Sequence, residues 1–350
     1  MSHHRQRTEF ELIMRHFAPL STAEAGAYGL RDDAASLSVP PGRELVVTKD
    51  MMAAGVHFFA EDPAQTIGRK ILRANLSDLA AMGATPRAYA MGLALPADMP
   101  SNWLEEFAAG LAADQIQFGV TLIGGDTIRA PGALTLSITA FGEVPLGQAL
   151  LRSTAQVGDD IYVTGTVGDA ALGLLAVEGG LAMLSAAERS ALVSRYHLPQ
   201  PRTEMGKQLI GLASAAIDIS DGLAADLGHL CAASEVGARI EVDAVPLSPA
   251  VRTASAADSK LLAQVLSGGD DYELLITAPP TVAAELGEAA GNADVTLSRI
   301  GALHDGTGVT VTGADGENMN FASAGYSHFS VNRRIHRLFK LGAHDWGSIA

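Results

Sequence analysis

Residues 216–242 read AIDISDGLAADLGHLCAASEVGARIEV, and this stretch sets the fold class. Its hydrophobic pattern predicts a strand over 216–219, a helix over 223–234 and a second strand over 239–242. The same alternation continues on both sides, with strands expected at 44–47, 88–95, 121–123, 134–143, 160–164 and 272–277, and helices at 63–82, at 203–213, and from 101 and 170 onward. This pattern is typical of an α/β (α+β) protein with mixed sheets covered by helices.

The chain is expected to form two such domains. Its 350 residues exceed the length of one typical domain. A stretch containing glycine and proline, 144–158, separates the strand that ends near 143 from the strand at 160–164. We therefore predict domains over 1–147 and 148–330. Residues 331–350 are locally basic and are predicted to form an extension outside the core.

The composition restricts the classes of function. Hydrophobic residues make up 48% and charged residues 18%, as in a globular protein. The 24 Lys+Arg against 39 Asp+Glu leave a net charge of −15, which argues against a nucleic-acid partner and against an electrostatic membrane clamp. No apolar stretch is long enough for a signal peptide or a bilayer span, so no membrane partner is expected. The single cysteine, Cys231, excludes a disulfide framework, and we expect a cytoplasmic protein.

Acidic residues concentrate where the predicted strands end. The positions are Asp32–Asp33, Asp50, Asp126, Asp218, Asp221 and Asp270–Asp271. Each one alone can cap a helix or fill a turn. Several of them lie beside glycine, and together they favour a shared role. Carboxylates grouped in this way suit Mg²⁺, which bridges protein oxygens to substrate phosphates. The chain has no GxxxxGK[ST] loop, so we expect phosphate handling without a Walker motif.

Asp78 is the most informative single residue. On the predicted helix 63–82, it falls in an apolar sector about 80° wide, and Arg69 and Arg73 are predicted to point away from it. The other members of the sector are Ile67, Ile71, Ala74 and Met82. A lone carboxylate on an apolar face needs a partner. We favour a metal ion, and a buried arginine or a set of backbone amides is the alternative.

Other residues allow two interpretations each. The glycine turn GTVGD at 165–169 can receive a phosphate at a helix start, or its glycines can simply fit the backbone. Arg152 can clamp a phosphate or lie exposed on the surface. His57 is flanked by apolar residues and can be a packed side chain. Tyr326 can stack on an aromatic ligand or close the core.

Seven blocks, in order, resemble the thiamine-monophosphate kinase family of the aminoimidazole-ribonucleotide synthetase superfamily. They are RDDAA (31–35), VTKDMMAAGVHF (47–58), NLSDLAAMGA (75–84), IGGDT (123–127), YVTGTVGD (162–169), AIDISDGLAADLGHL (216–230) and SGGDDYELLIT (267–277). The resemblance covers residues 10–329 and implies the two-domain aminoimidazole-ribonucleotide-synthetase-like fold. It also implies a homodimeric enzyme that moves the γ-phosphoryl group of ATP directly onto thiamine monophosphate, with Mg²⁺ as cofactor.

The resemblance also implies roles for individual positions. The metal positions are Asp33, Thr48, Lys49, Asp50, Asp78, Asp126, Asp218 and Asp221. The ATP positions are Gly125, Asp126, Arg152 and Ser220, and the substrate positions are His57, Asp270 and Tyr326. Three residues depart from the family pattern: Arg31 replaces glycine, Lys49 replaces a hydroxyl residue, and Asp270 replaces Glu.

Other functions stay open at the level of sequence. One is another ATP-dependent synthetase of the superfamily, of the aminoimidazole-ribonucleotide type. A second is a non-catalytic sensor of nucleotides or thiamine phosphates. Cys231 lies neither near the N-terminus nor at the C-terminus, which disfavours selenophosphate synthesis and hydrogenase maturation. For the kinase we expect catalysis by positioning and charge, with no side chain as general base.

Overall fold

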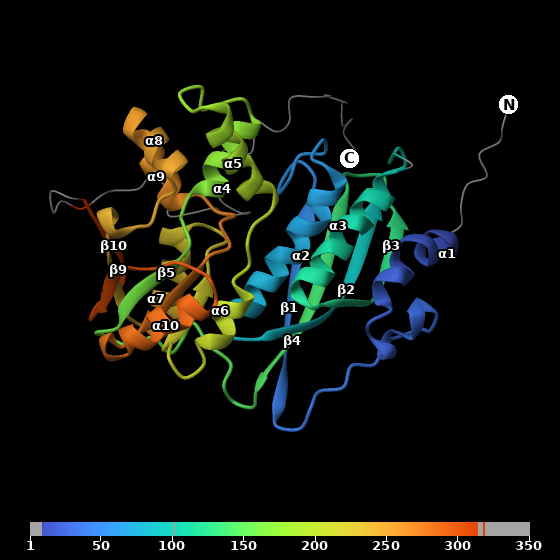
Figure 1. Ribbon diagram of the computed structural model, residues 1–350, viewed down its shortest axis with the longest axis horizontal. Coiled ribbons are helices and arrows are strands. Elements are labelled where there is room, and N and C mark those ends of the chain that lie inside the picture. The colour runs from blue at the N-terminus through green and yellow to red at the C-terminus, as the bar shows by residue number, and fades with distance from the viewer. Residues whose placement is uncertain (1–8, 101, 314–317, 319–350) are drawn as a thin grey trace, which may run out of the picture.

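The structure is a computed structural model that describes residues 9–100, 102–313 and 318. Tyr326 and the predicted extension 331–350 lie outside the described residues. Two mixed sheets lie side by side, each with helices packed on it (Figure 1). The predicted α/β (α+β) fold with two mixed sheets covered by helices is confirmed. No helix in the described part of the chain is both long enough and apolar enough to cross a membrane.

The N-terminal sheet has four strands in the order β1-β4-β2-β3. They are β1 (Arg43–Ala53), β2 (Thr85–Leu95), β3 (Thr121–Arg129) and β4 (Thr135–Pro145). Only β2 and β3 pair in parallel. Helices α2 (Ala64–Ala81) and α3 (Trp103–Phe118) cover one face and bury the apolar core between helices and sheet. Before β1 come α1 (Glu9–Leu12), a π-helical turn (Ile13–Phe17) and two 3₁₀ helices (Ala18–Ser21 and Ala25–Leu30).

The C-terminal sheet has six strands in the order β10-β7-β9-β5-β8-β6. They are β5 (Asp160–Thr164), β6 (Ala215–Asp218), β7 (Gly237–Glu241), β8 (Leu274–Ala278), β9 (Leu297–His304) and β10 (Gly308–Thr312). Its helices are α4 (Asp169–Val177), α5 (Ala186–His197), α6 (Thr203–Gln208), α7 (Leu223–Ser234), α8 (Pro249–Ala257), α9 (Lys260–Ser267) and α10 (Ala283–Asn292). Two short 3₁₀ helices, Val242–Ala244 and Pro280–Val282, lie between these elements.

Two strands extend beyond their predicted ends. We placed Asp50 and Asp126 at turns, but both lie inside strands, in β1 and β3. The whole of β1 pairs with β4, so its polar residues continue the ladder that the apolar residues begin. A prediction from hydrophobicity alone ends both strands too early, because pairing with a neighbouring strand keeps polar residues in a strand. Helix α6 is shorter than predicted and ends at Gln208. The N-cap of α3 is Asn102, and Ser101 lies outside the described residues.

Helix α2 is buried on nearly all sides, which corrects one expectation. We predicted that Arg73 points away from the core, yet it is only 1% exposed. Helix α3 covers that side, and Arg73 Nε and Nη2 donate to the Asp114 carboxylate at 2.7 and 2.9 Å. The other end of α2 packs against α6 with no space for a side chain, since a Cβ on Gly206 would lie 2.2 Å from the Ala80 carbonyl oxygen. Helix α2 therefore contacts both halves of the molecule.

Candidate active site

Two carboxylates meet where β1 passes under α2. Asp50 lies on the face of β1 that α2 covers, and Asp78 comes from α2. The Thr48 hydroxyl donates to Asp78 Oδ2. The Asp50 amide N–H donates to Asn75 Oδ1 at 3.1 Å, which holds the strand against the helix. Burial, together with the negative charge of Asp78, raises the pKa of Asp50 to about 7. Burial also raises the pKa of Asp78, against the opposing effects of Thr48 and Arg152.

A third carboxylate joins them from the other sheet. Asp218 ends β6 and is only 5% exposed. Burial and the nearby charge of Asp78 raise its pKa well above the usual range, and Asp226 and Asp50 add to the effect. Among the described residues its buried Oδ2 atom has no hydrogen-bond partner. Asp50, Asp78 and Asp218 are called the carboxylate cluster below, and the cluster spans both halves of the molecule.

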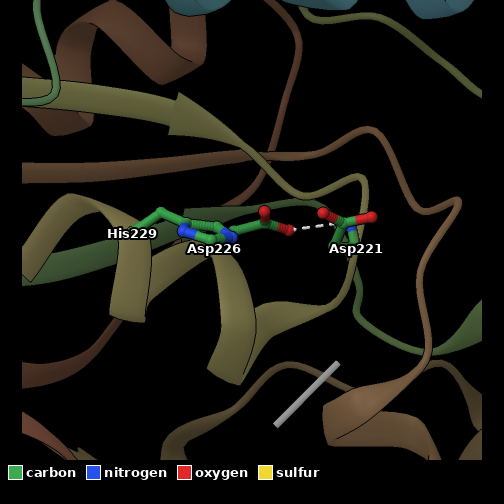
Figure 2. A group of neighbouring side chains, drawn as sticks. All are labelled: Asp221, Asp226 and His229. Carbon is green, nitrogen blue, oxygen red and sulfur yellow. Dashed lines mark hydrogen bonds between the residues drawn. The ribbon is translucent and has the colours of Figure 1, made fainter. Parts of the chain in front are cut away.

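The turn that follows β6 brings a second set of acids close to this cluster. Asp221, Asp226 and His229 each offer a ligand atom, and these atoms all lie within 4.8 Å of one another (Figure 2). Asp226 Oδ2 accepts hydrogen bonds from the backbone N–H groups of Ser220, Asp221 and Gly222, each at 3.0 Å. Asp226 therefore shapes the turn that carries Asp221. Burial and the charge of Asp221 raise its pKa to about 7.

The donor set of the carboxylate cluster fits a divalent cation. Buried carboxylates that repel one another bind protons more tightly, and a cation between them removes the repulsion. Mg²⁺ is bound by one or two carboxylates together with water and substrate phosphates. The unpartnered oxygen of Asp218 is the observation that fits such a ligand best, because a buried polar atom without a partner is unfavourable.

Asp33 and Asp126 form a separate group at the edge of the N-terminal sheet. Both are exposed, and with Gly125 they line a cavity of about 120 Å³ between β3 and the N-terminal helical turns. Asp50, Ile138, Met91 and Gly125 follow one another across the sheet in a single row. Three strand spacings amount to roughly 14 Å. The structure thus brings Asp33 and Asp126 together, but not beside the carboxylate cluster.

Lys49 faces away from its neighbours in the expected metal set. Its side chain lies on the opposite face of β1 from Thr48 and Asp50, and Nζ donates to Ser137 Oγ at 2.5 Å. The departure from a hydroxyl residue at this position leaves the side chains of the carboxylate cluster unchanged.

The expected ATP positions are divided between the two groups. Arg152 is exposed, and its charge lowers the pKa of Asp78, so it lies near the carboxylate cluster. Ser220 lies in the turn that Asp226 shapes. Gly125 belongs to the edge group with Asp126. Its φ of 156° and the 2.0 Å distance from an added Cβ to the Met91 carbonyl oxygen exclude any side chain there.

The glycine turn 165–169 serves the fold. The Gly168 and Ala170 N–H groups at the start of α4 donate to the carboxylate of Asp271 at 2.6 and 3.2 Å. An internal carboxylate thus takes the place in which we considered a phosphate. Asp271 is buried, and this burial raises its pKa to about 8. Of the two interpretations of this turn, the structural one agrees with the observed contacts.

The two described substrate positions are joined by a residue that the sequence did not single out. Lys70 Nζ donates to Asp270 Oδ2 at 2.8 Å and to the His57 carbonyl oxygen at 3.3 Å. His57 Nδ1 accepts a hydrogen bond from the Ala53 N–H at 3.1 Å. The sequence did contain a signal for Lys70. This residue lies beside the apolar sector of α2, where an isolated cation needs a partner. For Asp226 the signal was its place in the first turn of α7.

Comparisons with known proteins agree with this architecture. The AIR synthase related protein N-terminal domain matches residues 31–144, and the corresponding C-terminal domain matches residues 156–314. Thiamine-monophosphate kinase of Salmonella typhimurium is 42% identical over 326 residues, which are 92% of this chain and 98% of that protein. The crystal structure of thiamine-monophosphate kinase from Stenotrophomonas maltophilia is 44% identical, with a TM-score of 0.79, over 91% of this chain and 100% of that one.

The chain belongs to the thiamine-monophosphate kinase family. The expected family, enzyme class and aminoimidazole-ribonucleotide-synthetase-like fold are thereby confirmed. AaThiL, solved in complex with AMPPCP and TMP, is 29% identical with a TM-score of 0.73, over 85% of this chain and 91% of that one. The hydrogenase maturation protein HypE of E. coli shares the fold. It is 24% identical, with a TM-score of 0.74, over 93% of this chain and 98% of that one. The domain boundary at 147/148 stays a prediction, between the two matched regions.

Proposed function

We propose that the protein transfers the γ-phosphoryl group of ATP directly to the phosphate of thiamine monophosphate, in a Mg²⁺-dependent reaction that yields thiamine diphosphate. The carboxylate cluster is the observation that carries this proposal. Within residues 9–100, 102–313 and 318, none of its three members forms an ion pair with lysine or arginine. Membership of the thiamine-monophosphate kinase family, along nearly the whole chain, supports the substrate.

The proposed metal ligands are Asp50, Asp78, Asp218 and Asp221, with Thr48 and the Lys49 backbone beside them. Asp33 and Asp126, which lie apart at the sheet edge, are also proposed as metal ligands, for another of several Mg²⁺ ions. Bound Mg²⁺ would neutralise the charge of the triphosphate and of the group being transferred. The chain's own part is to hold these oxygens in place. Thr48 orients Asp78, and Asp226 fixes the turn of Asp221 through three backbone N–H groups.

The remaining roles follow the same division. ATP is proposed to contact Gly125, Asp126, Arg152 and Ser220, and thiamine monophosphate to contact His57, Asp270 and Tyr326. The attacking atom is a phosphate oxygen that is already ionised at neutral pH. No side chain therefore has to remove a proton, and the enzyme acts by alignment and charge.

A homodimer is part of the proposal. The face of the N-terminal sheet that α2 and α3 leave uncovered exposes Val47 by 54% and Met51 by 57%, with Leu45 and Ile128 also exposed. An apolar group of this kind on a strand face is typical of a protein–protein interface. Sedimentation of the full chain tests it: the wild type should sediment as a dimer, and Val47→Lys with Met51→Lys as a monomer.

The activity is tested by following two products of one reaction. Full-length protein is incubated with ATP, Mg²⁺ and thiamine monophosphate, and ADP and thiamine diphosphate are measured by chromatography. We expect equal amounts of both products, and none when thiamine monophosphate or Mg²⁺ is left out. A sensor would bind thiamine monophosphate without releasing ADP. A synthetase of the aminoimidazole-ribonucleotide type would release ADP only with its own precursor, and either result would contradict the proposal.

A further inference from the structure

Lys70 is a buried cation for which the proposed chemistry has no role. It lies on α2, and its side chain is only 3% exposed. A buried ammonium group needs a partner for each of its N–H bonds. Two of them point to Asp270 Oδ2 and to the His57 carbonyl oxygen. Nζ also makes a cation–π contact with the ring of Tyr196, whose centre lies 3.8 Å away. The ammonium group is therefore satisfied by protein atoms alone.

The partners of Lys70 come from both halves of the molecule. His57 follows β1 in the N-terminal half, Tyr196 lies near the end of α5, and Asp270 lies in the loop between α9 and β8. Lys70 itself belongs to the N-terminal half, so its ion pair with Asp270 crosses between the two. The two described substrate positions thus share one cation.

The ion pair with Lys70 orients the Asp270 carboxylate. Asp270 has a positive φ of 72°, a conformation that is uncommon outside glycine. Its backbone N–H donates to the Ser220 carbonyl oxygen at 2.9 Å, which anchors the main chain. The side chain is held by Lys70 and by the Tyr272 hydroxyl, which donates to Oδ1 at 3.3 Å. In the described part of the chain, Lys70 is the only cation paired with Asp270.

We propose that Lys70 is a positioning residue for thiamine monophosphate: it joins the His57 segment to the Asp270 carboxylate and so sets the geometry of the substrate end of the site. This inference rests on the proposed function, because it takes His57 and Asp270 as substrate contacts. Lys70 acts through these two residues and is not itself a substrate contact. Its loss should therefore weaken binding of thiamine monophosphate and leave ATP binding unchanged.

The test compares KM values for the two substrates. In Lys70→Met we expect the KM for thiamine monophosphate to rise at least about tenfold, as for the loss of a charged hydrogen bond, while the KM for ATP stays within about twofold. Lys70→Arg keeps the charge, but its planar fork does not reproduce the three contacts, so an intermediate KM is expected. A KM for thiamine monophosphate within about twofold of the wild type in either folded variant overturns the inference.

Two further variants separate positioning from folding. Arg73→Met removes a second buried cation from the same helix, one that pairs with Asp114 instead, and should lower the melting temperature without changing the KM for thiamine monophosphate. Asp270→Asn combined with Lys70→Met should lose less than the sum of the two single losses, and fully additive losses would contradict a shared role. A wild type without turnover overturns the proposed function and this inference together. An active wild type with unaffected Lys70 variants overturns this inference alone.

Discussion

Two buried acids lie next to each other in the C-terminal half, and their surroundings differ completely. Glu273 precedes β8 and is 0% exposed, and its carbonyl oxygen accepts the N–H of Ile219, the residue after Asp218. Its carboxylate accepts from Arg202 Nε at 2.6 Å, from Arg195 Nη2 at 2.8 Å and from Thr164 Oγ1 at 2.7 Å. Asp218 faces other carboxylates, and its Oδ2 atom has no partner among the described residues.

This contrast shows that burial alone does not reveal what an acid does. Glu273 has two guanidinium groups, so its charge is compensated within the protein and serves to hold α5, α6 and β8 together. Asp218 lacks any such compensation, and a buried uncompensated carboxylate is unfavourable unless a cation arrives from outside. Both acids are buried, so the number of cationic partners, and not burial, distinguishes the structural Glu273 from Asp218, which we assign to metal binding.

The largest expected effect is on turnover. Asp218→Asn removes a charged oxygen that the proposal assigns to metal binding, so kcat should fall about 10³-fold or more. The melting temperature without metal should stay the same or rise, because a repulsive buried charge is lost. Steady-state kinetics and thermal unfolding measure both. Asp98→Asn, at an exposed acid, is the matched control and should behave as the wild type. Near-normal kcat at saturating Mg²⁺ would remove Asp218 from the site.

Substitution of Glu273, the other acid of the compared pair, should lower the stability of the fold. Glu273→Gln leaves the partly buried Arg195 and Arg202 without their carboxylate, which costs up to about 3–5 kcal/mol by analogy with broken pairs that are fully buried. A loss of that size lowers the melting temperature by on the order of 10 °C in a protein of this length. Thermal unfolding followed by circular dichroism provides the measurement. An unchanged melting temperature would mean that the two arginines do not depend on Glu273.

The pH dependence of stability should change with metal. The pKa of Asp50 rises from its ordinary 3.8 to about 7, so the folded chain binds more protons than the unfolded chain between these values. Without metal, stability therefore falls as pH rises from about 4 to about 7. Mg²⁺ binds the ionised form, so its stabilising effect should grow over the same range. We expect a shift of about 5 °C on adding Mg²⁺ at pH 8, and a clearly smaller one at pH 6. Equal shifts at both pH values would contradict the assignment.

The smallest effect is expected at Lys49, on the uncovered face of the same strand. Lys49→Thr restores the hydroxyl type that the family resemblance predicts there, but the side chain lies on the face opposite Asp50. Turnover should stay within about threefold of the wild type, because no side chain of the carboxylate cluster is moved. Kinetics at limiting Mg²⁺ is the most sensitive measurement. A tenfold change would show that Lys49 reaches the metal by a route other than its backbone.

Part of the candidate site could be predicted from the sequence. Asp78 stood on an apolar face, and the structure sets it beside Asp50 and Asp218. From the block DISDG, Asp221 comes together with Asp226 and His229, which lie on the helix that follows it in the chain. By contrast, Asp33 and Asp126 were expected to share a role with these acids, and they line a separate cavity at the sheet edge. Which strands are neighbours in a sheet depends on pairing between distant segments, and no local pattern contains that information.

The sequence by itself determined the elements with a clear hydrophobic period, among them the helix Leu223–Ser234 and the strand Asp160–Thr164, and the order of the motifs along the chain. Short-range periodicity is enough for these, because each depends on neighbours within a few residues. Tertiary structure alone decided which charges are compensated: Arg73 by Asp114, Lys70 by Asp270, and Asp218 by no cation of the described chain. The energy of a buried charge depends on partners brought from far along the chain, so only the folded arrangement distinguishes an acid that supports the structure from one that binds a ligand.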